Sequence, residues 1–258
     1  MTLEGIDLKE RRRLTRAYPV LIAGKQGVGK TSCIETLTDE EKARTVYFDL
    51  DNKVLPNDMG DEYRTIIRLK PLGQILPDQV RLYKDRDNIK FKTITELKIY
   101  FSAAINHKDV DRIIIDSITA LHTDIEKHYV SVSKGFTVWQ LYRQEIADWL
   151  NIIKSETLFA GKFTYLFAHY FQAKNANLHD EEERFIQIQG NGFPRGTYES
   201  NFSTIVEVVD HQLISDNDDV YSSTRIHRSL SPLQTEENDI KDLEDNYLTK
   251  IGQAKESK

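Results

Sequence analysis

A run of eight residues near the N-terminus has glycine and lysine at the spacing of a phosphate-binding loop. The run, G-K-Q-G-V-G-K-T at positions 24–31, fits G-x-x-x-x-G-K-[ST] at every fixed position. A glycine-rich turn allows successive backbone N–H groups to point at a chain of phosphates. In this pattern Lys30 reaches the β- and γ-phosphates, and the Thr31 hydroxyl binds Mg²⁺. The predicted nucleotide-binding residues are Gly24, Lys25, Gln26, Gly27, Val28, Gly29, Lys30, Thr31 and Ser32.

Acidic residues follow two apolar segments that have the length of buried strands. Asp116 ends the segment 112–115, which places its carboxylate at the C-terminal edge of an α/β sheet, where such sheets bind ligands. We expect Asp116 to hold Mg²⁺ through a water molecule; the alternative is an aspartate that only caps the next helix. Asp49 and Asp51 lie on the same face of an extended chain. One of them is expected to orient and deprotonate the attacking water, the alternative being a capping or solvated pair.

A histidine closes a further apolar segment. His169 follows F-T-Y-L-F-A at 163–168, so a parallel sheet would bring it to the same edge as the phosphate loop. There it would face the γ-phosphate and sense its presence. The alternative is a histidine that is satisfied within the fold and has only a structural role. Together these residues predict the hydrolysis of a nucleoside triphosphate.

The segments that connect these residues alternate between strand and helix patterns. Apolar and β-branched runs predict strands, and apolar residues at helical spacing predict helices. The segment 51–92 is rich in proline and glycine, and only its run at 65–69 suggests a strand. This alternation predicts an α/β fold with a mainly parallel sheet and helices on both faces. Strands are expected at 20–23, 45–50, 112–115, 163–168, 185–189 and 204–213, and helices at 31–43, 95–107 and 139–156.

Composition and charge exclude several classes of protein. The chain has 258 residues, and 35 Lys and Arg against 41 Asp and Glu give a net charge of −6, which excludes a uniformly basic surface for nucleic acid. The longest apolar runs have the length of strands, so no membrane span is expected. Cys33 is the only cysteine and is expected in the core, which excludes an internal disulfide. The N-terminus shows no secretory segment, so a cytoplasmic location is expected.

Local charge divides the chain into three expected parts. Residues 1–17 form a basic segment, 18–230 form the nucleotide-binding domain, and 231–258 form an acidic tail that is expected to be mobile.

The order of the motifs resembles that of a known family. The loop at 24–31, F-D-L-D at 48–51, D-R-I-I-I-D-S-I-T-A-L at 111–121 and F-A-H at 167–169 resemble the phage-encoded, AAA-type RecA-like P-loop ATPases, which include proteins of single-strand annealing and recombination. The resemblance covers about residues 18–229 and implies a RecA-like fold with late antiparallel strands, ATP as the nucleotide and a host-cytoplasm location. It implies that Lys30 and Thr31 bind phosphate and Mg²⁺, that Asp116 binds Mg²⁺, that Asp51 is the catalytic acid and that His169 is the sensor.

The same resemblance implies partners. RecA-like domains stack into homo-oligomers in which an arginine of one subunit completes the site of the next, and Arg228 is expected in that role, with Arg225 and Arg195 as other candidates. Single-stranded DNA is the expected macromolecular partner, facing the segments 124–138 and 171–199. The first segment mixes basic and aromatic residues, and a further basic patch precedes the domain. These residues are Lys127, Tyr129, Lys134 and Phe136 in the segment, and Arg11, Arg12, Arg13 and Arg16 in the patch.

Two other interpretations stay open from the sequence. Lys25 stands at the position of the extra lysine of ParA/MinD-type partition ATPases, although Gln26 stands where that family has glycine. In the RecA-like family the catalytic acid is often a glutamate, and Asp51 is the shorter side chain at that position. A nucleotide-dependent protein-interaction switch with little turnover is therefore a third possibility.

Overall fold

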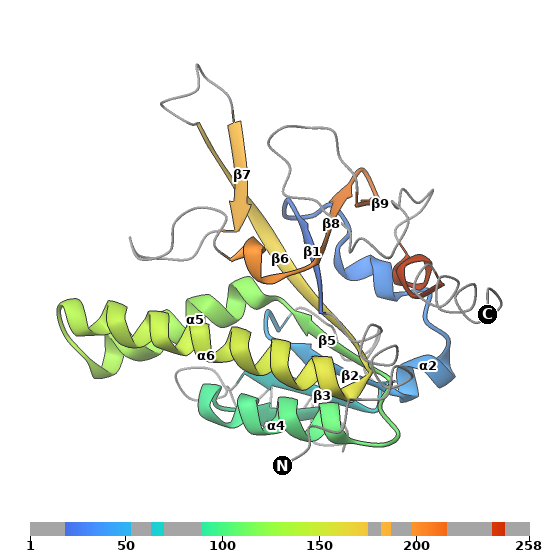
Figure 1. Ribbon diagram of the computed structural model, residues 1–258, viewed down its shortest axis with the longest axis horizontal. Coiled ribbons are helices and arrows are strands. Elements are labelled where there is room, and N and C mark those ends of the chain that lie inside the picture. Colours follow the sequence, from blue (N-terminus) through green and yellow to red (C-terminus); the bar gives the residue numbers. More distant parts are fainter. Residues whose placement is uncertain are drawn as a thin grey trace, which may run out of the picture.

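One large sheet organises the residues that the computed structural model describes, which are 19–52, 63–69, 89–174, 182–186, 198–215 and 239–245 (Figure 1). Within them the strand order is β4-β3-β2-β5-β6-β1-β8-β9, and β7 pairs with β6 outside this order. The strands are β1 (Val20–Gly24), β2 (Thr45–Asp49), β3 (Thr65–Leu69), β4 (Ile89–Lys92), β5 (Arg112–Asp116), β6 (Phe163–Lys174), β7 (Glu182–Ile186), β8 (Thr204–Val209) and β9 (Gln212–Ile214).

Most of the sheet is parallel. All neighbours from β4 across to β8 pair in parallel, whereas β9 pairs antiparallel with β8 and β7 pairs antiparallel with β6. The central strands are apolar along their length because both of their faces are covered. The structure thus confirms the predicted α/β fold, and it adds β4 within a segment where only one strand was expected.

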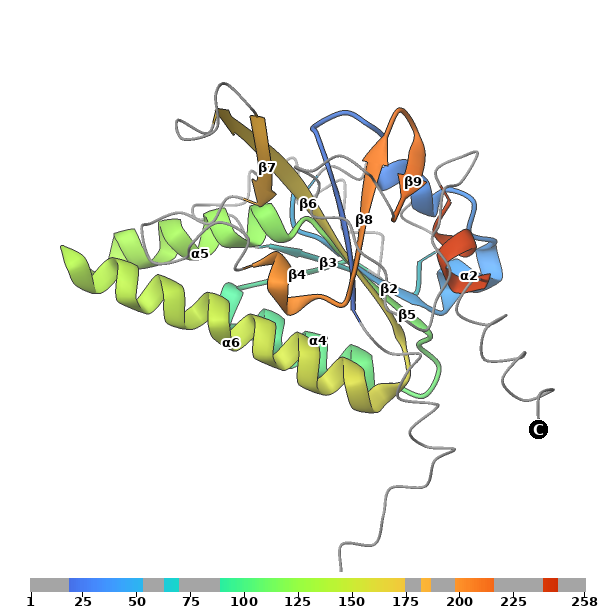
Figure 2. The ribbon, with the colours of Figure 1, turned by 45° about the horizontal axis from the view of Figure 1, so that its top comes forward.

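Three helices cover one face of the sheet, namely α4 (Ile94–Asn106), α5 (Ile118–Val132) and α6 (Phe136–Ala160) (Figures 1 and 2). The ring of Phe101 in α4 lies between Phe48 of β2 and Trp149 of α6, with centroid distances of 6.2 and 6.3 Å. The predicted helices at 95–107 and 139–156 are confirmed. At both ends α6 extends beyond the range predicted for it.

The opposite face is covered by short pieces from distant parts of the chain. The 3₁₀ turn η2 (Thr31–Ile34) contributes Cys33 and Ile34, and residues 240–245, which are helical, contribute Ile240 and Leu243. All four side chains are buried. Helices on both faces of the sheet and a core position for Cys33 are therefore confirmed.

The prediction of one continuous helix over 31–43 is wrong. η2 ends at Ile34, and a separate helix, α2 (Asp39–Ala43), starts after Thr38. The Thr38 backbone is extended, its hydroxyl accepts a hydrogen bond from the Glu41 N–H, and the Glu41 carboxylate accepts one from the Thr38 N–H. This capping box begins a new helix and interrupts the earlier one.

Part of the segment that was expected to be a mobile tail is packed onto the sheet. We call residues 239–245 the C-terminal strap. The Asp239 carboxylate accepts a hydrogen bond of 2.6 Å from Thr36, just beyond η2, and the ammonium of Lys241 lies 3.3 Å from the Glu41 carboxylate in α2. The strap therefore ties the end of the described chain to the elements that follow the phosphate loop.

A buried ion pair anchors the strap to the first residue of β5. The Glu244 carboxylate accepts hydrogen bonds from two nitrogens of the Arg112 guanidinium and one of 3.1 Å from the Tyr165 hydroxyl. Burial raises the pKa of Glu244, and the bonds from Arg112 and Tyr165 oppose that shift. A bidentate pair with a third donor satisfies the carboxylate and so makes its burial tolerable.

Glu244→Ala is expected to lower the free energy of unfolding by about 3–5 kcal/mol, because the Arg112 guanidinium would stay buried without this carboxylate. The two side chains are only 6% and 9% exposed. Urea denaturation measures the change. The matched control is Lys241→Ala in the same strap, whose more exposed ion pair should contribute less than about 1 kcal/mol. Equal losses in the two variants would contradict the role given to the buried pair.

Candidate nucleotide-binding site

The predicted phosphate loop connects β1 to η2 at the carboxyl end of the parallel strands. In this loop Gly27 and Gly29 have φ of +81° and +89°, a backbone conformation that side chains other than glycine rarely adopt. β1 lies between β6 and β8, and its last residue, Gly24, is in register with His169 of β6. The loop, Asp116 and His169 are therefore brought to one edge of the sheet, where α/β folds bind ligands.

Lys30 lies across the start of this loop. Its side chain is buried, and its ammonium donates to the backbone carbonyls of Gly24 and Lys25 at 3.0 and 2.5 Å. These bonds hold a positive charge within the curve of the loop. Lys25 itself is exposed.

The two predicted magnesium ligands are in direct contact although they are 85 positions apart in the sequence. The Thr31 hydroxyl donates to Oδ2 of Asp116 at 2.7 Å, and the Tyr47 hydroxyl donates to the same oxygen at 2.8 Å. Burial and the charge of Asp116 raise the pKa of Tyr47, so this hydroxyl remains a donor. Hydroxyl and carboxylate oxygens are the ligands that Mg²⁺ prefers, so the pair fits this ion. The sequence analysis missed Tyr47, whose contact depends on the pairing of β2 with β5.

The two acids at the end of β2 have different surroundings in the structure. Asp49 faces Arg68 of the neighbouring strand β3, and their charged groups are 2.9 Å apart. The two side chains are 1% and 2% exposed. Asp49 therefore forms a buried ion pair inside the sheet, which is neither the capping nor the solvated position considered from the sequence.

Asp51 lies instead beside the residues of the site. Its Oδ1 accepts a hydrogen bond of 3.1 Å from the Ser117 hydroxyl, and its Oδ2 lies 3.7 Å from Nε2 of His169. Ser117 also caps α5, because its hydroxyl accepts from the Ala120 N–H at 3.2 Å. The backbone N–H of His169 donates to Thr119 at 3.0 Å. The segment that follows Asp116 thus positions both Asp51 and His169.

Several predicted partner residues lie outside the described part of the chain: Arg11, Arg12, Arg13, Arg16, Arg195, Arg225 and Arg228. Residues 171–199, the second expected DNA-facing segment, are described only in part, as the end of β6, as β7 and as the start of η3 (Glu199–Asn201).

The segment 124–138 is not the loop that was expected. It consists of the end of α5, a turn at 133–135 and the start of α6, and Figure 1 shows this helical hairpin extending beyond the sheet. Ile125 and Val138 are buried and hold the two helices in the fold. Beyond them, Val130, Val132 and Phe136 are 56%, 62% and 68% exposed. The end of the hairpin is therefore an exposed surface with large apolar side chains.

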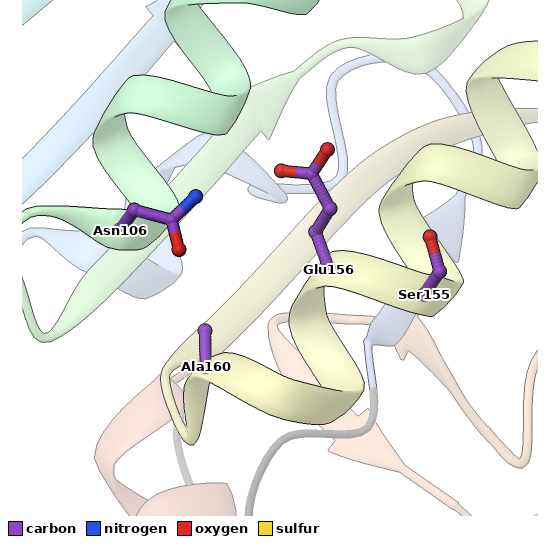
Figure 3. Close-up of a pocket in the computed structure, with 4 residues that line it drawn as sticks. All are labelled: Asn106, Ser155, Glu156 and Ala160. Carbon is purple, nitrogen blue, oxygen red and sulfur yellow. The ribbon is translucent and has the colours of Figure 1, made fainter.

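A separate pocket of about 240 Å³ lies in the helical layer, where α4 and α6 end (Figure 3). Its lining includes Asn106, Ser155, Glu156 and Ala160. α4 ends shortly before β5 begins, so this pocket is at the edge of the sheet opposite the phosphate loop. It is not part of the nucleotide site.

Two further structural features bear on ligands. In the described ranges, no group of three or more His, Cys, Asp and Glu side chains is arranged to hold a metal ion. No helix among the described residues is long and apolar enough to cross a membrane.

A family model matches most of the chain, including the residues of this site. The AAA domain family matches residues 16–209 of the 258. A search of the curated proteins gives no significant match. One similar solved structure is a KaiC-like protein from the archaeon Pyrococcus horikoshii, at 13% identity and a TM-score of 0.36, over 79% of this chain and 74% of that one. Since the family match spans well over half of the sequence and contains the phosphate loop, Asp116 and His169, the chain belongs to the AAA domain family.

Proposed function

We propose that this protein binds and hydrolyses Mg-ATP at the edge of the sheet described above. The observation that carries the proposal is the 2.7 Å hydrogen bond between Thr31 and Asp116. It joins the last residue of the phosphate loop to the acidic residue that ends β5, and the Lys30 ammonium is held in the same loop. Loop amides, a lysine and a hydroxyl–carboxylate pair are the groups that a magnesium triphosphate requires.

Each residue has a distinct part in the proposed reaction. Lys30 contacts the β- and γ-phosphates and offsets the negative charge that develops on them. Thr31 and Asp116 hold Mg²⁺, which when bound neutralises phosphate charge. Asp51 orients the attacking water and accepts its proton, and its contact with Ser117 keeps the carboxylate in place. His169, close to Asp51 and level with Gly24, senses the γ-phosphate.

Phosphate release from ATP tests the proposal. The wild-type protein is expected to release phosphate with Mg²⁺ and to stop when the metal is chelated. Asp116→Asn should require more Mg²⁺ for the same rate, because one ligand has lost its charge. The matched control is Asp111→Asn, which removes the charge of an acid that pairs with Arg44 just before the start of β5 and should leave the Mg²⁺ requirement unchanged. Turnover that is independent of Mg²⁺ would overturn the assignment.

We further propose that single-stranded DNA binds the end of the α5–α6 hairpin, in a role in DNA recombination, replication or repair. Lys127 of α5, Lys134 of the turn and the ring of Phe136 at the start of α6 are all exposed there. Exposed lysines attract the phosphates of a single strand, and an aromatic ring stacks on its bases. Because the net charge of the protein is −6, DNA has to be bound through a local group of basic residues. The exposed lysines of the hairpin are such a group and so support the proposal.

The double variant Lys127→Ala/Lys134→Ala is expected to weaken binding of single-stranded DNA and to flatten its salt dependence. Each phosphate contact contributes about −0.7 to the slope of log affinity against log salt concentration. The loss of two contacts should therefore make the slope less negative by about 1.4. Lys108→Ala, an exposed lysine after α4, is the control. Unchanged affinity and slope in the double variant would remove the hairpin from DNA binding.

We also propose how subunits of this protein assemble. A homo-oligomer in which Arg228 or Arg225 reaches the neighbouring site is our first hypothesis, and a partition-type dimer that uses Lys25, or a switch with little turnover, are the alternatives. Mixing Arg228→Ala subunits with Lys30→Ala subunits should restore some ATPase activity only when sites are shared between subunits.

A further inference from the structure

The strand order gives the phosphate loop two unlike sides. On one side of β1 lie β6 and β5, and the residues expected at Mg²⁺ and the γ-phosphate, Asp116 and His169, belong to these strands. On the other side lies β8. A triphosphate that follows the loop with its γ-phosphate toward Asp116 therefore has its nucleoside toward β8.

The hairpin of β8 and β9 extends past the end of β1 on that second side. Ala23 of β1 is in register with Glu207 of β8, so the turn after Val209 lies beyond the strand, at the level of the loop. Figure 2 shows β8 beside β1, with β9 on the far side of β8. The turn residues Asp210 and His211 have φ of +46° and +63°. Two left-handed residues are typical of a tight two-residue hairpin, for which asparagine and glycine are the usual choice.

The side chain of His211 is exposed and lies against the phosphate loop. A Cβ atom built on Gly29 would be 2.7 Å from Nδ1 and 3.1 Å from Cε1 of this imidazole, and 2.8 Å from the Ser32 hydroxyl. The ring is thus in contact with the loop at its β8 side. A histidine in a left-handed conformation is uncommon, and such a residue marks a position where the side chain can have a role.

We infer that His211 is the residue that contacts the nucleoside, with its flat ring stacked on the base of the bound nucleotide. The inference rests on the proposed function, because it takes the loop as a triphosphate site. It adds a contact to the nucleoside, the half of the ligand that the phosphate-binding residues do not reach. Stacking of a base on an aromatic ring tolerates any base, so His211 adds affinity for a nucleoside without selecting one.

The test compares a ligand that has a nucleoside with one that has only phosphates. His211→Asn removes the ring, and asparagine tolerates the left-handed backbone, so the hairpin is retained. It should weaken Mg-ATP binding about tenfold and leave the affinity for Mg-tripolyphosphate unchanged. His211→Phe keeps a flat ring and should bind Mg-ATP close to wild type. His107→Asn, on an exposed histidine that ends α4, is the control and should change neither affinity.

The outcomes separate this inference from the proposed function. Wild-type protein that binds neither ligand would overturn both. Wild-type protein that binds both, with His211→Asn unchanged toward Mg-ATP or equally weakened toward both ligands, would overturn the role of His211 alone. A His211→Phe variant as weak as His211→Asn would overturn stacking as the mode of contact.

Discussion

Lys30→Ala is expected to lose Mg-ATP binding by roughly 100-fold to 10⁴-fold, and ATP turnover with it. Hydrogen bonds to charged groups contribute about 1.5–3 kcal/mol each, and this lysine is expected to contact two phosphates. In the structure its ammonium donates to the carbonyls of Gly24 and Lys25, which belong to the loop itself. The fold should therefore survive the substitution. Isothermal titration with Mg-ATP measures the affinity, and thermal unfolding measures the fold.

Lys25→Ala is the matched control for this variant. Lys25 lies in the same loop but its side chain is exposed, so its loss should leave the affinity of an isolated subunit nearly unchanged. Loss of turnover in Lys25→Ala, with Arg225 and Arg228 dispensable, would favour the partition-type dimer. Wild-type affinity in Lys30→Ala would refute the nucleotide site as a whole.

Asp51→Asn should leave Mg-ATP binding intact and lower turnover by about 10²–10⁴-fold, the usual contribution of a general base or water-positioning group. The asparagine keeps the size of the side chain and can still accept a hydrogen bond from Ser117. What it loses is the charge that would accept a proton from water. Single-turnover hydrolysis with saturating ATP isolates this step from binding.

Asp49→Asn provides the contrast, because it is the same substitution two positions earlier. Asp49 faces the buried guanidinium of Arg68, so losing its charge should destabilise the fold by about 3–5 kcal/mol. Turnover per folded molecule should change little. Slow hydrolysis by a stable Asp49→Asn protein, with Asp51→Asn active, would exchange the roles of the two acids.

The phosphate loop and the sheet could be predicted because both depend on local pattern. Fixed glycines and a lysine specify the loop at 24–31, and the alternation of apolar runs with amphipathic segments specifies parallel strands. Parallel strands end at the same edge of the sheet, so Asp116 could be placed next to the loop. This was possible although Asp116 and its hydrogen-bond partner Thr31 are 85 positions apart in the sequence.

The residues around Asp116 could not be predicted in the same way. Tyr47 and Ser117 act through hydrogen bonds whose partners depend on which strands are neighbours and in what register. The choice between Asp49 and Asp51 depended on Arg68, whose strand β3 pairs with β2. His211 became visible only through its contact with Gly29, because a histidine in a turn has no motif of its own.

Two errors at the level of elements have different physical causes. The helix expected over 31–43 is interrupted, and the strap that was expected to be mobile covers part of the same face of the sheet. Composition indicated a solvated tail because acids surround Ile240 and Leu243. The local capping box of Thr38 and Glu41 interrupts the helix. Long-range packing holds the strap, because its two apolar residues are buried and an ion pair satisfies its carboxylate.

The place of β1 in the sheet has a consequence for the synthesis of the protein. Its neighbours β6 and β8 come about 140 and 180 residues later in the chain, so both edges of an apolar strand lack their partners during translation. At about 5–20 residues per second the ribosome needs roughly 10 to 40 s to reach β8. An unpaired apolar edge is a template for aggregation. The apolar strand β1 therefore has no partner on either edge until β6 is synthesised, and the phosphate loop that follows it takes its place between both neighbours only after β8 has joined the sheet.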